Sequence, residues 1–86
     1  MATDSLAVRV LLFARARELA GADSIALALS SPATVADLRT VLASRHPAIA
    51  ALLARSALAV NHAFADDSTP LSPSDEIALI PPVSGG

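Results

Sequence analysis

Four segments of the chain alternate large apolar residues with small or polar ones, which is the period of a half-buried β-strand. They cover residues 6–14, 24–29, 57–61 and 76–80, and a short edge segment is expected around Phe64. The first segment predicts two faces, a core face and its opposite: Leu6, Val8, Val10 and Leu12 on the first, and Arg9, Leu11 and Phe13 on the second.

Apolar residues recur at helical spacing in the middle of the chain, and this predicts one main helix over residues 35–45. Thr34 precedes it and Asp37 lies three residues further on, which is an approximate capping box. A shorter helical turn is expected in RARELAG, where Gly21 can adopt the left-handed conformation that ends a helix. The alanine-rich AIAALLA predicts another short turn.

Two early strands, one crossover helix and two or three late strands predict a small α+β domain spanning residues 1–86. We expect a mixed sheet of four to five strands with the main helix across one face. A right-handed crossover would place the last strand beside the first, in the centre of the sheet. Whatever follows the last strand would then leave the domain from a fixed point.

The charge of the chain argues against a polyanion partner, because the net charge is −2 and all six basic residues are scattered arginines. Without cysteine there is no disulfide framework, thiol nucleophile or thiolate metal site, which is compatible with a reducing compartment. The N-terminal residues lack a secretory pattern, and no apolar run is long enough to span a membrane. We therefore expect a cytoplasmic protein that binds neither nucleic acid nor membrane.

Conventional catalytic chemistry finds little support in the chain. His46 and His62 adjoin turns without a second ligand at metal spacing, so we expect exposed loop histidines and no metal site. The acidic pairs at 66–67 and 75–76 are typical of solvated turns. The serines and glycines form neither a nucleophile elbow nor a phosphate loop.

The sequence closes on EIALIPPVSGG, in which a buried strand runs directly into prolines and glycines. Pro81 and Pro82 lack an N–H and hold an extended backbone, so we expect a stiff stem. Gly85 and Gly86 have no Cβ, which lets the backbone pass through a channel too narrow for side chains. We predict a flexible arm over residues 81–86; an ordinary frayed terminus is the alternative.

The chain resembles the small subunit of molybdopterin synthase, a β-grasp sulfur carrier related to ubiquitin and to the thiamin sulfur carrier. The resemblance extends from about Val8 to Gly86, through VLLFARARELAG, TVADLR, AVN and PLSPSDEIALIPPVSGG. The last of these is its most specific part, because the thiamin carrier normally shares only the two glycines. The chain departs from related carriers in having no lysine, so its side chains cannot receive an isopeptide.

This resemblance implies that Gly86 is the reacting residue. An E1-like enzyme would adenylate its carboxylate with ATP and magnesium, and a persulfide donor would convert it to a thiocarboxylate, an ionised nucleophile. The chain itself would bind no cofactor, and it would act as the sulfur-donating subunit of a heterotetramer with a large subunit. Sulfur would go to cyclic pyranopterin monophosphate. The tail residues that would enter the active site of the partner are Pro81, Pro82, Val83, Ser84 and Gly85.

Three apolar residues are expected to face away from the core, and in the resembling family the corresponding face packs on the large subunit. They are Phe13, Phe64 and Ile80. An exposed patch of this kind indicates a partner surface, whereas a second minor core is the alternative.

Three other functions compete with the molybdopterin assignment. A thiamin-type carrier would use the same thiocarboxylate with a different synthase. A ubiquitin-like modifier would form isopeptide adducts on other proteins, and a plain β-grasp interaction module would not use its tail.

Overall fold

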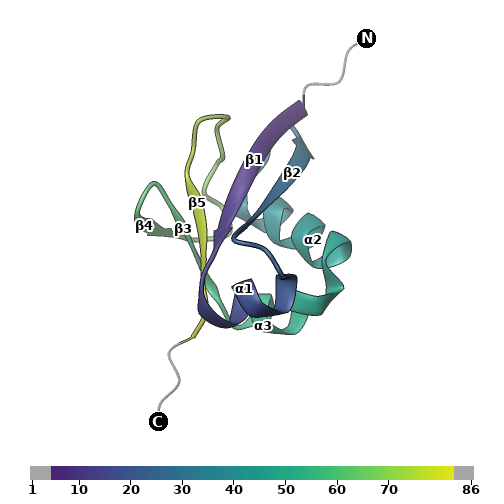
Figure 1. The fold of residues 1–86 in the computed structure, drawn as a ribbon. Helices are drawn as coiled ribbons and strands as arrows, with labels where there is room; N and C mark the ends of the chain where they lie inside the picture. The colour runs from purple at the N-terminus through teal and green to yellow at the C-terminus, as the bar shows by residue number, and fades with distance from the viewer. Residues whose placement is uncertain (1–4, 83–86) are drawn as a thin grey trace.

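The computed structural model describes residues 5–82, in which a five-stranded mixed sheet has its helices on one face (Figure 1). The elements follow the predicted order, and the main helix has the predicted bounds. They are β1 (Ser5–Leu12), α1 (Ala14–Ala20), β2 (Ser24–Ser30), α2 (Val35–Arg45), the 3-10 helix η1 (Pro47–Ile49), α3 (Ala50–Ala54), β3 (Ala57–Val60), β4 (Ala63–Ala65) and β5 (Ile77–Ile80).

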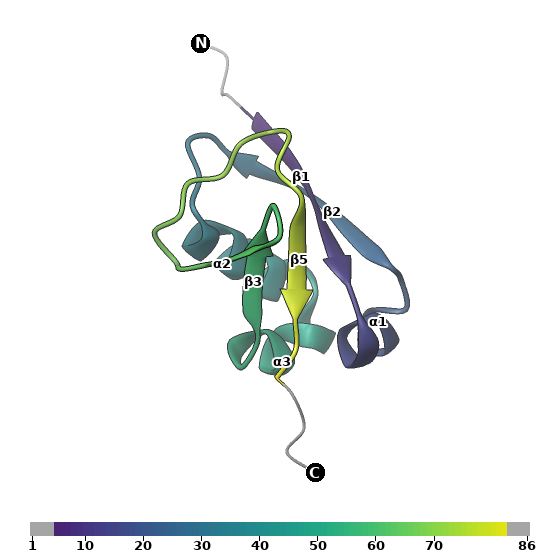
Figure 2. The same ribbon diagram turned by 90° about the vertical axis from the view of Figure 1, so that its left-hand side faces the viewer.

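The strand order is β2-β1-β5-β3-β4, so the last strand lies in the centre of the sheet, as predicted (Figure 2). β5 runs parallel to β1 and antiparallel to β3, while β1–β2 and β3–β4 are antiparallel pairs. The α+β class and the mixed sheet are therefore confirmed. β5 is hydrogen-bonded on both edges, which fixes the position at which the chain leaves the sheet.

The core lies between the sheet and α2, and it contains the inward sets that strand alternation predicts. Val10, Ile77 and Leu79 are completely buried beneath Leu38 and Leu42 of α2. The apolar area removed from water by such residues contributes roughly 25 cal/mol per Å², which is the main favourable term in folding.

The strand bounds differ from the sequence prediction by one or two residues, and two of these differences have a clear local reason. β1 ends at Leu12 rather than at residue 14, because Phe13 becomes the N-cap of α1 and Ala14 takes a positive φ of 52°. β3 ends at Val60 rather than at Asn61, which enters the turn to β4 with a φ of 52°. Gly21 has the predicted left-handed conformation, with a φ of 71°.

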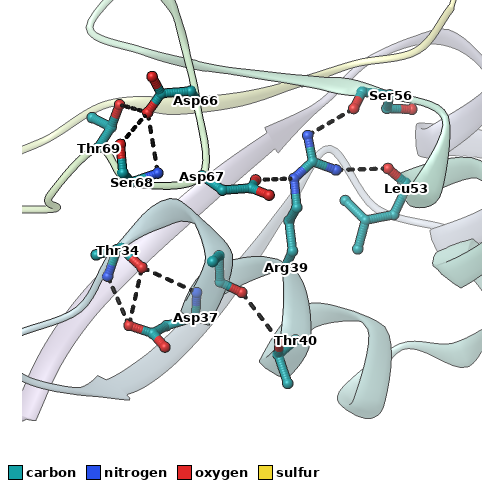
Figure 3. A network of polar contacts seen from close by, with 11 residues as sticks. Thr34, Asp37, Arg39, Thr40, Leu53, Ser56, Asp66, Asp67, Ser68 and Thr69 are labelled. Carbon is teal, nitrogen blue, oxygen red and sulfur yellow. Dashed lines mark hydrogen bonds and ion pairs between the residues drawn. The ribbon is translucent and has the colours of Figure 1, made fainter.

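The predicted capping box at the start of α2 is present. Asp37 Oδ2 accepts a hydrogen bond from the Thr34 backbone N–H at 2.9 Å, and Thr34 Oγ1 accepts one from the Asp37 N–H at 3.4 Å (Figure 3). The loop before β5 continues this cap, since Thr69 and Asp67 accept hydrogen bonds at their carbonyl oxygens from the N–H groups of Val35 and Ala36. These contacts satisfy N–H groups that the first turn of a helix leaves free.

Arg39 connects α2 to two other segments of the chain (Figure 3). Its guanidinium donates to the carbonyl oxygens of Leu53 and Ser56 at 2.9 and 2.8 Å. Its Nε lies 3.2 Å from Oδ1 of Asp67. The planar fork of arginine suits several acceptors at once, so this side chain holds α3 and the 66–71 loop against the main helix.

We expect Thr34→Ala to lower the free energy of unfolding by about 1 kcal/mol, because an N-cap hydroxyl is lost. Thr40→Ala is the matched control, since Thr40 Oγ1 donates within α2 to the carbonyl oxygen of Ala36 and caps nothing. Its effect should stay within about 0.5 kcal/mol. Urea denaturation measures both, and equal effects would contradict the capping role.

Hydrogen bonds from Ser68, and then from Thr69, lower the pKa of Asp66 below its ordinary value. The folded protein therefore binds this proton less readily than the unfolded chain. The stability that Asp66 contributes is complete above the ordinary aspartate pKa and is lost as the pH falls through the lowered one. A carboxyl NMR titration should find a low midpoint that Ser68→Ala raises; an unchanged midpoint would contradict this assignment.

Candidate functional site

The face of the sheet opposite α2 carries a hollow, and the strand register explains its shape. Leu11, Ala78, Ala59 and Phe64 are successive partners in β1, β5, β3 and β4, so their side chains form one row across the sheet. The two middle residues are alanines and the two outer ones are large, so the side chains project less from the sheet at the centre of the row than at its ends.

This sheet hollow has a volume of about 320 Å³. Its lining is apolar at the row itself and at the end where β5 leaves the sheet, and polar at the opposite end. The lining residues are Leu11, Phe13, Ala59, His62, Phe64, Glu76, Ala78 and Ile80.

All three residues predicted to contact a partner line the sheet hollow. Phe13 is 49% exposed and Phe64 is 77% exposed, and Ile80 is partly buried. Within residues 5–82 no helix covers this face, so the two aromatic rings do not form a second core. Their role as a partner interface remains a prediction.

The polar end of the sheet hollow was not anticipated from the sequence. His62 Nε2 lies 3.6 Å from Glu76 Oε2, although β4 and a long loop separate the two residues along the chain. Asn61 holds them together: its N–H donates to the Glu76 carbonyl oxygen at 2.7 Å, and its Oδ1 accepts from the Glu76 N–H at 2.9 Å. A histidine in a turn gave no sequence signal for this pairing.

The predicted reacting arm begins where β5 ends, beside α1 and α3 (Figure 1). Pro81 is partly buried and Pro82 is exposed, and neither belongs to a helix or strand. The other predicted arm residues lie outside the described part of the chain: Val83, Ser84, Gly85 and Gly86.

The remaining sequence candidates have structural roles or none. Asp66 and Asp67 hold the 66–71 loop, and Asp75 accepts hydrogen bonds from the Ser72 N–H and the Asn61 amide. His62 is exposed as expected, but His46 is partly buried, because it caps α2 where the chain turns into η1.

Residues 5–82 bring together no group of three or more histidine, aspartate or glutamate side chains that could hold a metal ion. Across the same residues, the structure has no helix with the length and hydropathy needed to cross a membrane.

Comparison with known proteins agrees with the geometry. The model of the ThiS family matches residues 10–86. The molybdopterin synthase sulfur carrier subunit of Arabidopsis thaliana is 38% identical over 84 residues, covering 98% of this chain and 88% of that protein. The resemblance drawn from the sequence motifs is confirmed.

Two groups of solved structures share the fold. SAMP1, small archaeal modifier protein 1, from Haloferax volcanii superposes with a TM-score of 0.82 and 30% identity, covering 93% of this chain and 99% of that one. A chain in the complex of subunits 1 and 2 of molybdopterin-converting factor from Helicobacter pylori gives a TM-score of 0.68 and 27% identity, covering 94% and 100%. The β-grasp, ubiquitin-like fold is thus established, and the chain belongs to the ThiS family of sulfur carriers.

Proposed function

We propose that this chain is the sulfur carrier subunit of a molybdopterin synthase. The observation that carries the proposal is the exposed sheet hollow beside the end of a buried central strand that continues into PPVSGG. The names of the relatives support it, and the Helicobacter pylori complex supports a second subunit as the partner.

The chemistry proposed for Gly86 begins with a carboxylate, which is a poor electrophile. An E1-like enzyme would join its oxygen to the α-phosphorus of ATP, with magnesium, and release pyrophosphate. The terminal sulfur of a persulfide donor would then attack the acyl carbon and displace AMP, which gives an acyl disulfide. A second thiol of the donor would attack the donor's own sulfur and break this S–S bond, which releases the terminal thiocarboxylate and leaves the donor as a disulfide. The thiocarboxylate stays ionised at neutral pH and is therefore a strong nucleophile.

The described residues would position this reaction without taking part in it. β5 is paired on both edges, and Ile77 and Leu79 are completely buried, so Pro81 starts from a fixed place. Proline contributes no N–H to a sheet ladder and holds its φ near −65°. The prolines thus lead the chain away from the sheet toward the large subunit, where sulfur would pass to cyclic pyranopterin monophosphate.

The sheet hollow is the proposed docking surface for the large subunit. Phe13, Phe64 and Ile80 line the same hollow and Ile80 is the last residue of β5, so a protein bound there would also receive the residues after Pro82. Aromatic residues that fill a pocket at the centre of an interface carry much of its binding energy.

Two further functions have support of their own. The ThiS family match is compatible with a thiamin-type carrier, and the similarity to SAMP1 is compatible with a ubiquitin-like modifier. All three would activate the same C-terminal glycine. They differ in what accepts the activated group: a pyranopterin, a thiazole precursor or a lysine amine on another protein.

Activation should increase the intact mass of the chain by one sulfur-for-oxygen exchange after incubation with an activating enzyme, ATP and a sulfur donor. Deleting Gly86 should abolish that increase. Adding one alanine after Gly86 should also block sulfur transfer, because errors near 1 Å at a reacting atom cost roughly 10²-fold in rate. Intact-mass spectrometry and a molybdopterin assay measure the two steps.

The outcomes of this test separate the three functions. If the untrimmed alanine-extended chain still supported molybdopterin formation, the carrier role would be wrong. Thiazole formation in place of molybdopterin would indicate the thiamin-type carrier. Isopeptide adducts on cellular proteins would indicate the modifier.

Phe13→Arg and Ile80→Arg should each weaken binding to the large subunit by about 2 kcal/mol or more, because a charge replaces an apolar anchor. Neither side chain belongs to the buried core, so the melting temperature should change little. Leu19→Arg is the matched control, since Leu19 is an exposed apolar residue outside the sheet hollow. Calorimetry that found equal affinities for all three variants would contradict the docking surface.

A further inference from the structure

Glu76 places a carboxylate in the wall of a hollow whose other lining residues, apart from His62, are apolar. Among the described residues that line the hollow it is the only acidic one, and its side chain is 52% exposed. Among residues 5–82 the one basic side chain within 4.0 Å of its carboxylate is His62, which is 82% exposed and is charged only when protonated. A pair this open to water contributes little to stability by itself, so its placement suggests a role in binding.

The backbone holds His62 close to Glu76. Val60 pairs with Ala63, so Asn61 and His62 form a two-residue hairpin turn, and both have a positive φ, of 52° and 70°. Glycine is the preferred residue at the second position of such a turn. The chain has histidine there instead, and the two backbone-directed hydrogen bonds of Asn61 fix the turn to Glu76.

Docking on the sheet hollow would change the surroundings of this pair. A protein that covers the hollow removes water from the Glu76 carboxylate, and an unpaired buried carboxylate is costly. An adjacent positive charge offsets that cost. Histidine is the side chain that can gain such a charge near neutral pH.

The other charged groups nearby are less suited to this role. Arg9 lies on the same face of β1, one residue before the Val10–Ile77 pair, but it forms no ion pair with Glu76 in the described structure. Asp75, which precedes Glu76 in the chain, already accepts hydrogen bonds from the Ser72 N–H and the Asn61 amide. Within the described residues, His62 is therefore the side chain that would become the counterion of Glu76 on gaining a proton.

We propose that His62 takes up a proton when the large subunit docks on the sheet hollow, and that the resulting positive charge neutralises the Glu76 carboxylate within the complex. This inference rests on the proposed function, because it takes the large subunit as the occupant. His62 and Glu76 then form the polar edge of the interface, and affinity increases as the pH falls from 8 to 6. Linkage limits the gain to about tenfold per pH unit for one proton.

Titration calorimetry of the full chain against the purified large subunit at pH 7, in two buffers of different ionisation enthalpy, measures the proton uptake. We expect a positive uptake of at most one proton, and an affinity roughly threefold higher at pH 6 than at pH 8. His62→Asn should abolish both, and asparagine tolerates the left-handed turn. Glu76→Gln should abolish them as well, because no carboxylate remains to be neutralised.

Two control variants separate this pair from its neighbours. Arg9→Gln removes the other cation of this face, and His46→Asn removes the other histidine, which caps α2 away from the hollow. Both should keep the proton uptake of the unmodified chain. Thermal denaturation checks that every variant is folded.

The inference is overturned if the unmodified chain binds without proton uptake, or if the uptake survives in His62→Asn. Loss of the uptake in Arg9→Gln or His46→Asn would also overturn it. Failure of the unmodified chain to bind the large subunit at any pH would instead contradict the proposed function, and this inference with it.

Discussion

The parallel pairing of β1 with β5 is the contact on which the rest of the structure depends. It joins the first and last strands of the chain, so the loop that it closes contains every other element, at a considerable cost in conformational entropy. Burial offsets that cost, because Val10, Ile77 and Leu79 are completely removed from water. With β3 on its other edge, β5 is fixed along its length, and the chain beyond Ile80 starts from a defined point.

The two faces of this sheet serve different purposes because strand side chains alternate. One face packs against α2 and supplies the core. On the other face the middle of the row is occupied by Ala59 and Ala78, and the hollow exists because these side chains are short while Leu11 and Phe64 are long. The proposed docking surface therefore requires no element beyond those that build the core.

Charged side chains are used in two ways. Arg39 is only 25% exposed, and each of its three guanidinium nitrogens contacts an acceptor, two carbonyl oxygens and Asp67, so it joins segments of the fold. His62 and Glu76 are open to water, and their contact is not needed to hold the turn in place. Asn61 holds the turn through its two hydrogen bonds to the backbone of Glu76. Their contact can therefore be rearranged when a partner binds, while the fold stays the same.

The sequence by itself determined the strands, the main helix with its Thr34–Asp37 cap, and the family, because these depend on local period, capping residues and a contiguous ending. It also placed Phe13 and Ile80 on the face away from the core, since alternation needs no tertiary information. Phe64 joined them through the family resemblance. Only the tertiary structure decided that these residues surround one hollow, that two alanines form its floor, and that His62 meets Glu76. Those contacts join residues distant along the chain, and they depend on the register of β5 against β1 and β3, which the alternation within one strand does not specify.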